Sequence, residues 1–512
     1  MKDHLPELLR VVARLRDPKL EIIDEDYDKD SKENISKLYY GIKSGKFAND
    51  AAAAAEIYGA PATDTRYSTL KSRLKRKLLN SLFLLDLGKR GYSKYAQTLY
   101  RTNKRLFVFK TLLTLGARNL AVQIGEAELS ICAAYHLTAH RIELLRELLF
   151  HASMIGNDSK FAEYASMLQA ANADLTAECR SEELAYGLQI HFAKKAGIGP
   201  EVAEVANKFA EELRTLRASC SSSAFVTNYS RVQVWTQLSQ QNYRAAIELC
   251  EEFKEYLNAH PLVAFPSRYG EFALFRLAAC RAISDYEGGN AAAIDCGKSF
   301  LPSSNNWFVF NEELFLLSMN TLHFDAASKI YHEVTTNPRF ESQNKNSKER
   351  WFIFGLYLRY IELVRNRQSI RESGVESGKL RIKTFLRTVP VYTSDKLGFN
   401  VAILVLQIVM LLEIEDFDSI ITRMEALRTY RSRYLPANQN RQSSIFFKLL
   451  QIMEKNSFSF KLVSVKSAKY VEQLAAANTA SDLSDGVQIV PFTWLWDQIL
   501  SKLKEVEQKV RA

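Results

Sequence analysis

The sequence predicts an all-α fold made of helix-turn-helix repeats, and three observations lead to it. Gly (20) and Pro (11) are scarce in the 512 residues, at about half their usual share. β-Sandwiches and barrels are therefore disfavoured, because they need a turn rich in these residues about every 8 to 12 positions. Apolar residues make up 47% of the chain and recur at i, i+3 and i+4, which is the helical spacing. A helix-turn-helix pattern then repeats in the C-terminal half.

Residues 1–92 are predicted to form an N-terminal helical module. Residues 17–35 carry eight acidic residues without apolar periodicity, which predicts an exposed loop. Helices are expected over 36–42, 49–58 and 65–87. The third helix has one apolar stripe, formed by Leu70, Leu74, Leu78, Leu82 and Leu85. Two short helices and a longer basic one resemble a helix-turn-helix unit, whose third helix would enter a major groove.

The positive charge of the chain is concentrated in one segment. Residues 61–110 contain thirteen Lys/Arg and two acidic residues, whereas the whole chain carries +10. The candidate binding residues are the basic side chains of this segment: Lys71, Arg73, Lys75, Arg76, Lys77, Lys89, Arg90, Arg101, Lys104 and Arg105. Three explanations stay open. The cluster is an ordinary solvated helix face, or it pairs with an acidic partner or with the acidic stretch 17–35, or it binds nucleic acid together with interleaved aromatic residues.

Residues 93–475 are predicted to form stacked helix pairs. The upstream helices are expected over residues 93–115, 118–135, 138–154, 158–175, 181–196, 199–217 and 222–240. Further along, an aromatic residue follows a polar one where the second helix of a pair begins. These junctions are Asn242-Tyr243, Asp285-Tyr286, His323-Phe324, Asp416-Phe417 and Ser457-Phe458. One junction is missing from the series, and we expect it near residues 365–380.

The junctions have a physical explanation. Asn, Asp and Ser are good N-caps, because their side chains accept a hydrogen bond from the free N–H groups of the next helix. A small residue, Ala246, Gly289 or Ala327, lies three positions after the aromatic residue and would let two helices approach closely. Proline follows most of the second helices, at Pro261, Pro302, Pro338 and Pro436, where it would stop them.

These junctions resemble the start of the second helix of a tetratricopeptide repeat (TPR). The likeness is carried by residues 242–248 (Asn-Tyr-Arg-Ala-Ala-Ile-Glu) and 323–327 (His-Phe-Asp-Ala-Ala). The units are longer than the 34 residues of that family, and only Leu314 matches its first-helix pattern. The resemblance implies a divergent, TPR-like superhelical solenoid with a concave binding face.

The C-terminal part completes this solenoid. Residues 397–412 are the most apolar run of the chain, but they fall short of the ~20 residues of a membrane span and predict a buried helix. Residues 476–512 are expected to form a small-residue linker (476–486) and an amphipathic capping helix (487–511). No signal peptide is predicted at the N-terminus.

The sequence contains no established catalytic motif. P-loop, dinucleotide-binding and nucleophile-elbow patterns are missing from it. His136 and His140, four apart on one expected helix, lack a third zinc ligand and the general-base Glu of a zinc protease. The six cysteines have no metal-type spacing and are expected to be small buried residues in a reducing compartment.

These observations lead to one main expectation and one alternative. The chain is expected to be a cytoplasmic, non-enzymatic scaffold without metal or cofactor, which holds a protein or peptide partner on the concave face of the solenoid and does not contact membranes. The alternative is a nucleic-acid-binding regulator that uses the basic residues of 65–105.

Overall fold

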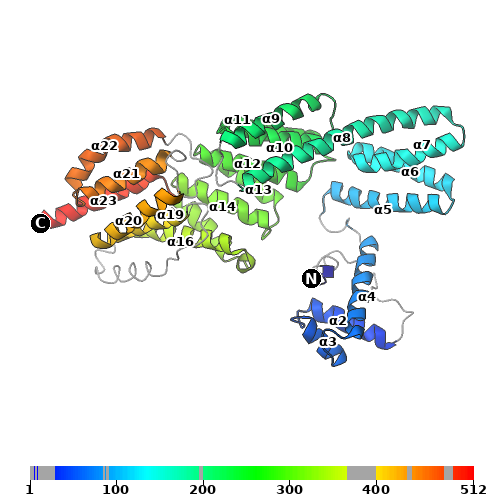
Figure 1. The fold of residues 1–512 in the computed structure, drawn as a ribbon, viewed down its shortest axis with the longest axis horizontal. Coiled ribbons are helices and arrows are strands. Elements are labelled where there is room, and N and C mark those ends of the chain that lie inside the picture. Colours follow the sequence, from blue (N-terminus) through cyan, green and yellow to red (C-terminus); the bar gives the residue numbers. More distant parts are fainter. Residues whose placement is uncertain are drawn as a thin grey trace. The chain divides into compact units, whose positions relative to one another are not determined.

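The computed structural model describes residues 5, 8, 9, 29–84, 87, 92–194, 200–365, 399–434, 441–477 and 488–511. Over these residues it contains twenty α-helices and no β-strand (Figure 1). The predicted all-α class is confirmed. The chain divides into two compact units, residues 1–171 and residues 172–512, which we describe in turn.

The first unit begins with an N-terminal bundle of α2 (Lys29–Lys43), α3 (Asp50–Tyr58) and α4 (Thr65–Ser81). The core of the bundle contains Leu38, Ala54, Leu70, Leu74 and Leu78, each at most 3% exposed. The three predicted helices are confirmed, although α4 ends at Ser81 and a single 3-10 turn (Leu82–Leu84) follows it. Side-chain caps explain where α3 and α4 begin, since Asn49 and Asp64 accept hydrogen bonds from the backbone N–H groups of Ala52 and Arg66.

The predicted acidic loop is wrong where the structure describes it. Helix α2 starts at Lys29, so residues 29–35 are helical, while 17–28 lie outside the described residues. Ile35 is buried in the bundle, and the Glu33 carboxylate pairs with Lys37 one turn later at 2.7 Å. Helix formation here depends on an apolar contact with the rest of the bundle, which a count of acidic residues does not show.

Four antiparallel helices follow: α5 (Lys94–Thr114), α6 (Arg118–Ala134), α7 (Thr138–Met154) and α8 (Asp158–Lys194). They share a core in which Phe109, Cys132, Leu144 and Leu148 are almost fully buried. The sequence predicts two helices where α8 is continuous for 37 residues. No Gly or Pro interrupts α8 near residue 177, and Ala177 is buried there in a core shared with residues of α9 and α10.

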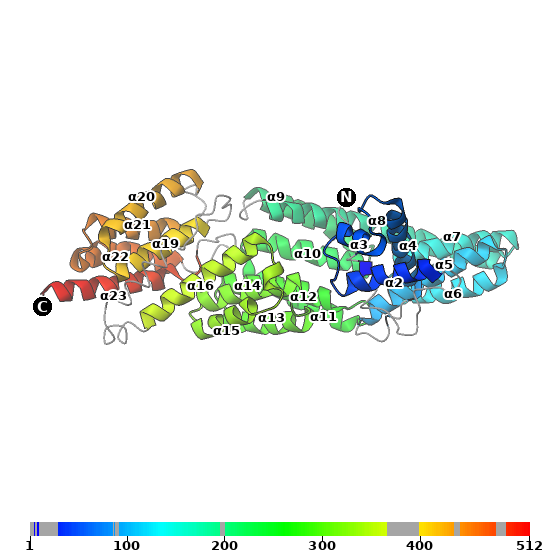
Figure 2. The same ribbon diagram turned by 90° about the horizontal axis from the view of Figure 1, so that it is seen from below.

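The second unit continues the succession of helices. Its remaining elements are α9 (Pro200–Arg217), α10 (Ser223–Ser239), α11 (Tyr243–Ala259), α12 (Pro266–Ala282), α13 (Tyr286–Ser299), α14 (Asn305–Asn320), α15 (Phe324–Thr335), α16 (Lys345–Arg365), α19 (Phe399–Glu413), α20 (Phe417–Tyr434), α21 (Arg441–Lys455), α22 (Phe460–Ala477) and α23 (Phe492–Arg511). Consecutive helices contact one another, and α12 also contacts α14. In Figure 2, α11, α13 and α15 form one row, and α12, α14 and α16 form the other. This alternation of two rows is that of a helical repeat solenoid.

One type of turn closes the helix pairs. The second residue after the helix that precedes the turn has a positive φ: Gly116, His136, Gly156, Gln241, Ser284, Leu322, Glu415 and Ser457. In each turn the N–H of the next residue donates to a carbonyl five positions earlier, as from Asn242 to Gln237 and from His323 to Ser318. This hydrogen bond defines the Schellman C-cap. The repeated signal of the sequence therefore marks a left-handed C-cap followed by a new helix.

The details of the predicted junctions are confirmed in part. Tyr243, Tyr286, Phe324 and Phe417 are each the first residue of a helix, whereas after Phe458 the helix α22 begins two residues later. The predicted N-cap role holds at Asp285 and Asp416, whose side chains accept backbone hydrogen bonds. It is wrong at Asn242, which makes no capping bond; its side-chain amide instead donates to the side-chain oxygens of Gln237 and Gln240. The missing junction is expected near residues 365–380, of which all but residue 365 lie outside the described residues.

Small residues bring the paired helices together, as predicted. Ala246 and Ala327 are fully buried. A Cβ added at Gly289 would come within 2.3 Å of the Leu317 side chain, so α13 and α14 are too close here for any larger residue. Helices α11, α13 and α15 end before Pro261, Pro302 and Pro338; Pro436 lies outside the described residues.

Ion pairs connect helices that are two apart in the chain order and belong to successive repeats. Arg231 of α10 pairs with Glu271 of α12 at 2.5 Å. Arg281 of α12 pairs with Glu313 of α14 at 2.8 Å, and Arg350 of α16 pairs with the neighbouring Glu312 at 2.5 Å. We call these three pairs the arginine ladder. Its members are largely buried and connect helices of successive repeats.

The C-terminal helices confirm two predictions. Helix α19 is buried on nearly all sides, and no helix in the described part of the chain is long and apolar enough to cross a membrane. Helix α23 buries Phe492, Trp496 and Leu503 against the preceding helices. Its Lys502 donates to Glu415 at 3.0 Å, which ties this capping helix to the turn before α20.

Candidate functional site

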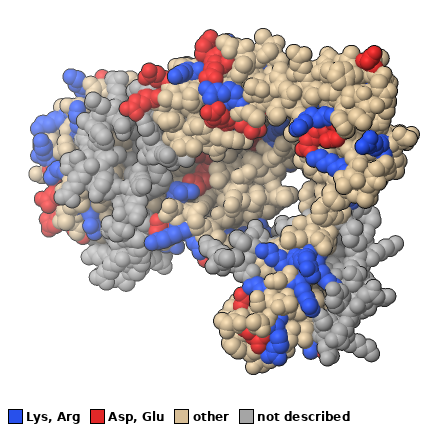
Figure 3. All heavy atoms as spheres, turned by 45° about the vertical axis from the view of Figure 1, so that its right-hand side comes forward, with Lys and Arg blue, Asp and Glu red and all other residues tan. Residues whose placement is uncertain are grey.

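The exposed side of α4 is the first candidate surface. Tyr67, Leu70, Leu74 and Leu78 form its buried stripe. The opposite side, which we call the α4 face, consists of Arg66, Ser68, Thr69, Ser72, Arg73, Lys75, Arg76 and Asn80, all exposed. Residues 65–81 include six basic residues and no acidic one. Figure 3 shows Lys and Arg side chains gathered on this bundle.

Two of the predicted binding residues pair with acidic side chains of the fold. The Lys71 ammonium lies 2.6 Å from the Asp50 carboxylate of α3. Burial opposes ionisation of Asp50, but hydrogen bonds from Lys71 and Tyr67 outweigh it and lower the pKa of this carboxyl. Arg105 pairs at 3.1 Å with Glu128, whose side chain is 1% exposed. Removing Arg105 would leave this buried carboxylate without its cation.

Other predicted residues face solvent. Lys75, Arg76 and Arg101 are exposed and have no ion-pair partner in the described part of the chain. Lys104 lies over the Tyr100 ring, 5.3 Å from its centre. Of the remaining candidates on α4, Arg73 is exposed and Lys77 is half-buried. Lys89 and Arg90 lie outside the described residues.

The segment after α4 contacts α5. The Tyr100 hydroxyl donates to the Leu82 carbonyl at 2.5 Å, and the rings of Phe83 and Phe107 are 5.9 Å apart. Tyr95, Tyr100 and Phe107, three of the aromatic residues that alternate with the basic residues of this segment, therefore have intramolecular contacts. Phe107 nevertheless stays 60% exposed, so these contacts do not remove the aromatic residues from the surface.

The expected histidine pair is not on one helix. His136 occupies the left-handed turn before α7, whereas His140 lies within α7 and contacts the Asn103 amide oxygen at 2.9 Å. Burial lowers the pKa of His140. No group of three or more His, Cys, Asp and Glu side chains in the described residues is arranged to hold a metal ion. All six cysteines are free thiols, and Cys179, predicted to be buried, is exposed on α8.

A second candidate surface lies where the α5–α6 and α7–α8 turns meet. Helices α5 and α7 are in contact, and both turns lie at the same end of the helices in Figures 1 and 2. Six large apolar side chains, each 43–75% exposed, surround these turns: Leu115, Leu120, Phe150, Met154, Ile155 and Phe161. We call them the turn patch. The surface of α5–α8 has broad uncharged areas in Figure 3.

The sequence patterns do not predict the turn patch. Its two signals are Leu115-Gly116 and Met154-Ile155-Gly156, which place apolar residues directly before a turn glycine, where polar residues are usual. An isolated exposed apolar residue needs no explanation, but a group of six around two turns makes this surface a candidate for binding. No protein-family model, curated protein or solved structure matches the chain.

Proposed function

We propose that this protein is a non-enzymatic scaffold that binds a protein partner, and that its helix pairs are divergent TPR-like repeats. The turn patch is the single observation that supports binding most strongly. Water-exposed Phe, Met, Ile and Leu side chains gain free energy when a partner covers them, at about 25 cal/mol per Å². The partner therefore presents an apolar surface to these turns.

The TPR-like assignment has separate support. The Schellman turns, the aromatic residue after them and the small residue one turn later recur along the chain. The concave face of the solenoid remains the proposed site for a second segment of the partner. The proposal places the protein in the cytoplasm, in agreement with six free cysteines, since a reducing compartment keeps thiols unpaired.

The scaffold proposal is tested by isolating partners with matched variants. The protein is purified from its native host, with nuclease, as wild type and as Met154→Ser/Ile155→Ser. The control is Leu301→Ser/Val465→Ser, which removes two apolar side chains outside the turn patch that are even more exposed than Met154 and Ile155. We expect mass spectrometry to identify a stoichiometric partner that the control retains and the turn-patch variant loses. A partner retained by both variants, or lost from both, contradicts the proposal.

A second candidate function is nucleic-acid binding by the α4 face. The specific observation in its favour is a fully exposed helix side without acidic residues, on which Lys75 and Arg76 have no ion-pair partner in the described structure. Its phosphate contacts would release counterions, so log affinity would fall linearly with log salt, by about 0.9 per phosphate contacted on duplex DNA.

Fluorescence anisotropy with labelled duplex DNA, over roughly 50 to 200 mM salt, tests this second candidate. Lys75→Glu/Arg76→Glu is expected to reduce the salt slope by about 2 and to weaken binding to all sequences. Lys208→Glu/Lys329→Glu changes the net charge equally at exposed sites of the second unit and is expected to leave binding intact. Equal weakening by both variants would mean nonspecific attraction to the whole protein, and would exclude the α4 face as the site.

A further inference from the structure

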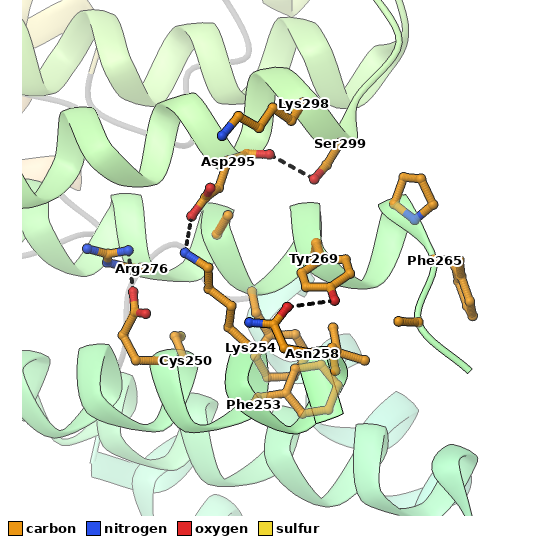
Figure 4. Close-up of a pocket in the computed structure, with 16 residues that line it drawn as sticks. Cys250, Phe253, Lys254, Asn258, Phe265, Tyr269, Arg276, Asp295, Lys298 and Ser299 are labelled. Carbon is orange, nitrogen blue, oxygen red and sulfur yellow. Dashed lines mark hydrogen bonds and ion pairs between the residues drawn. The ribbon is translucent and has the colours of Figure 1, made fainter. Parts of the chain in front are cut away.

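A pocket of about 370 Å³ lies between α11, α12 and α13, apart from both surfaces described above (Figure 4). Its apolar wall is formed by Phe253, Leu257, Phe265, Tyr269 and Phe272. Charged side chains line the other end: Glu251, Lys254, Arg276, Asp295 and Lys298. In Figure 4 the basic groups lie at one side of the pocket and Phe265 at the opposite side. The volume is in the range of small-molecule sites.

The composition of α13 explains why this space is open. Gly289, Ala292 and Ala293 pack against the neighbouring helices, and the only large aliphatic residue of α13, Ile294, is 54% exposed. The residues of α13 that line the pocket are Asp295, Lys298 and Ser299. None of these fills the gap beside the apolar wall, so a ligand would replace the missing side chain.

The charges of the pocket do not cancel. The Lys254 ammonium lies 2.6 Å from the Asp295 carboxylate, and Arg276 pairs with Glu251. Lys298 is exposed and has no ion-pair partner in the described structure, so three cations face two carboxylates. The Nε of Arg276 is buried without a hydrogen bond. Both features favour an anionic group at this end of the pocket.

We propose that this pocket binds a small amphiphile with an apolar body and a single carboxylate. The apolar body lies against Phe253, Leu257 and Tyr269, and the carboxylate lies between Lys298 and Arg276. The Tyr269 ring is fixed beside the apolar body of the ligand, because its hydroxyl donates to the Asn258 amide oxygen at 3.0 Å. This binding site is independent of the scaffold and nucleic-acid functions, since neither the turn patch nor the α4 face contributes to it.

Isothermal titration calorimetry of the full chain with decanoate tests the assignment. Decanol and decylamine are the neutral and cationic counterparts of the same chain length. The variants are Lys298→Glu, which reverses the unpaired charge, and Ser299→Leu, which fills the pocket. Lys329→Glu is the matched control, because Lys329 is an exposed lysine of α15 without an ion-pair partner in the described residues. Circular dichroism confirms that each variant is folded.

We expect saturable binding of decanoate, with decylamine at least about tenfold weaker. Lys298→Glu and Ser299→Leu are each expected to weaken decanoate binding about tenfold, while Lys329→Glu and Met154→Ser/Ile155→Ser leave it unchanged. Any of three results overturns the proposal: no decanoate binding, equal affinity for the three compounds, or unchanged affinity in both pocket variants. Loss of decanoate binding in the Met154→Ser/Ile155→Ser variant would instead place the ligand on the turn patch and also exclude the pocket.

Discussion

The guanidinium of Arg281 on α12 lies 2.8 Å from the carboxylate of Glu313 on α14, and only 8% of the arginine side chain is exposed. The two residues belong to successive repeats, so their contact depends on the stacking of one helix pair on the next. Desolvation offsets most of the attraction within such a pair, but removing one partner leaves a charge poorly solvated. We therefore expect mispaired stacking of the repeats to be unfavourable, because it would leave these charges buried without partners.

Arg281→Met is expected to lower the free energy of unfolding by roughly 3 kcal/mol, because Glu313 loses its cation in a largely buried site. Urea unfolding, followed by circular dichroism, measures the change. The matched control is Arg365→Met, since Arg365 and its partner Asp325 are 49% and 84% exposed; this variant should lose at most about 1 kcal/mol. Similar losses in both variants would mean that the ladder pair has no special role.

Gly289→Ala is expected to destabilise the protein by about 1 to 3 kcal/mol, because its Cβ would overlap Leu317 in the close contact between α13 and α14. Gly297→Ala lies in the same helix, where an added Cβ meets nothing within 4 Å, and should gain roughly 0.5 to 1 kcal/mol from reduced backbone entropy. Thermal unfolding of the two variants should thus shift in opposite directions. Shifts of the same sign would contradict the close packing.

The left-handed turns predict two further opposite changes. Gly156 and Gln241 have φ values of 65° and 61°, which Gly adopts without the Cβ clash that other residues suffer. Gln241→Gly is expected to raise the unfolding free energy by about 0.5 kcal/mol, whereas Gly156→Ala should lower it by about 1 kcal/mol. Gln241→Ala serves as control, because it keeps the Cβ and should bring no gain. If Gln241→Ala stabilises as much as Gln241→Gly, the backbone explanation is wrong.

Glu415 gives the protein a pH-dependent contact. Burial opposes its ionisation, but hydrogen bonds from Lys509 and Lys502 outweigh this and lower its pKa. Because the pKa of Glu415 is lower in the folded state, its ionised carboxylate stabilises the fold at pH values above the unfolded-state pKa of about 4.3. This stabilisation is lost as the pH falls through the folded-state pKa.

Glu415→Gln should therefore cost about 2 kcal/mol at pH 7, since Lys502 is only 7% exposed and loses its partner. Urea unfolding between about pH 7 and pH 3 measures the difference from wild type, which should shrink below about pH 4. The control is Glu33→Gln, which removes an exposed ion pair with Lys37. It should shift the urea midpoint of unfolding much less than Glu415→Gln does. A difference for Glu415→Gln that is constant with pH would show that its charge does not contribute.

The candidate site could be predicted from the sequence only in part. Charge counting locates the basic segment, and Lys75, Arg76 and Arg101 do face solvent. It cannot distinguish them from Lys71 and Arg105, because Asp50 and Glu128 pair with these residues from 21 and 23 positions away in the chain. Whether a cation is free for a ligand depends on which acidic side chains the fold brings near it.

The sequence by itself determined the all-α class, nearly all helix positions and the recurring junctions, because apolar periodicity and turn residues act over a few neighbouring positions. Only the tertiary structure decided that α8 is continuous, that His136 and His140 are on different elements, and that apolar residues of two turns form one surface. The pocket beside α13 and the arginine ladder also depend on it. These features arise from contacts between helices distant in sequence, whose geometry no local pattern specifies.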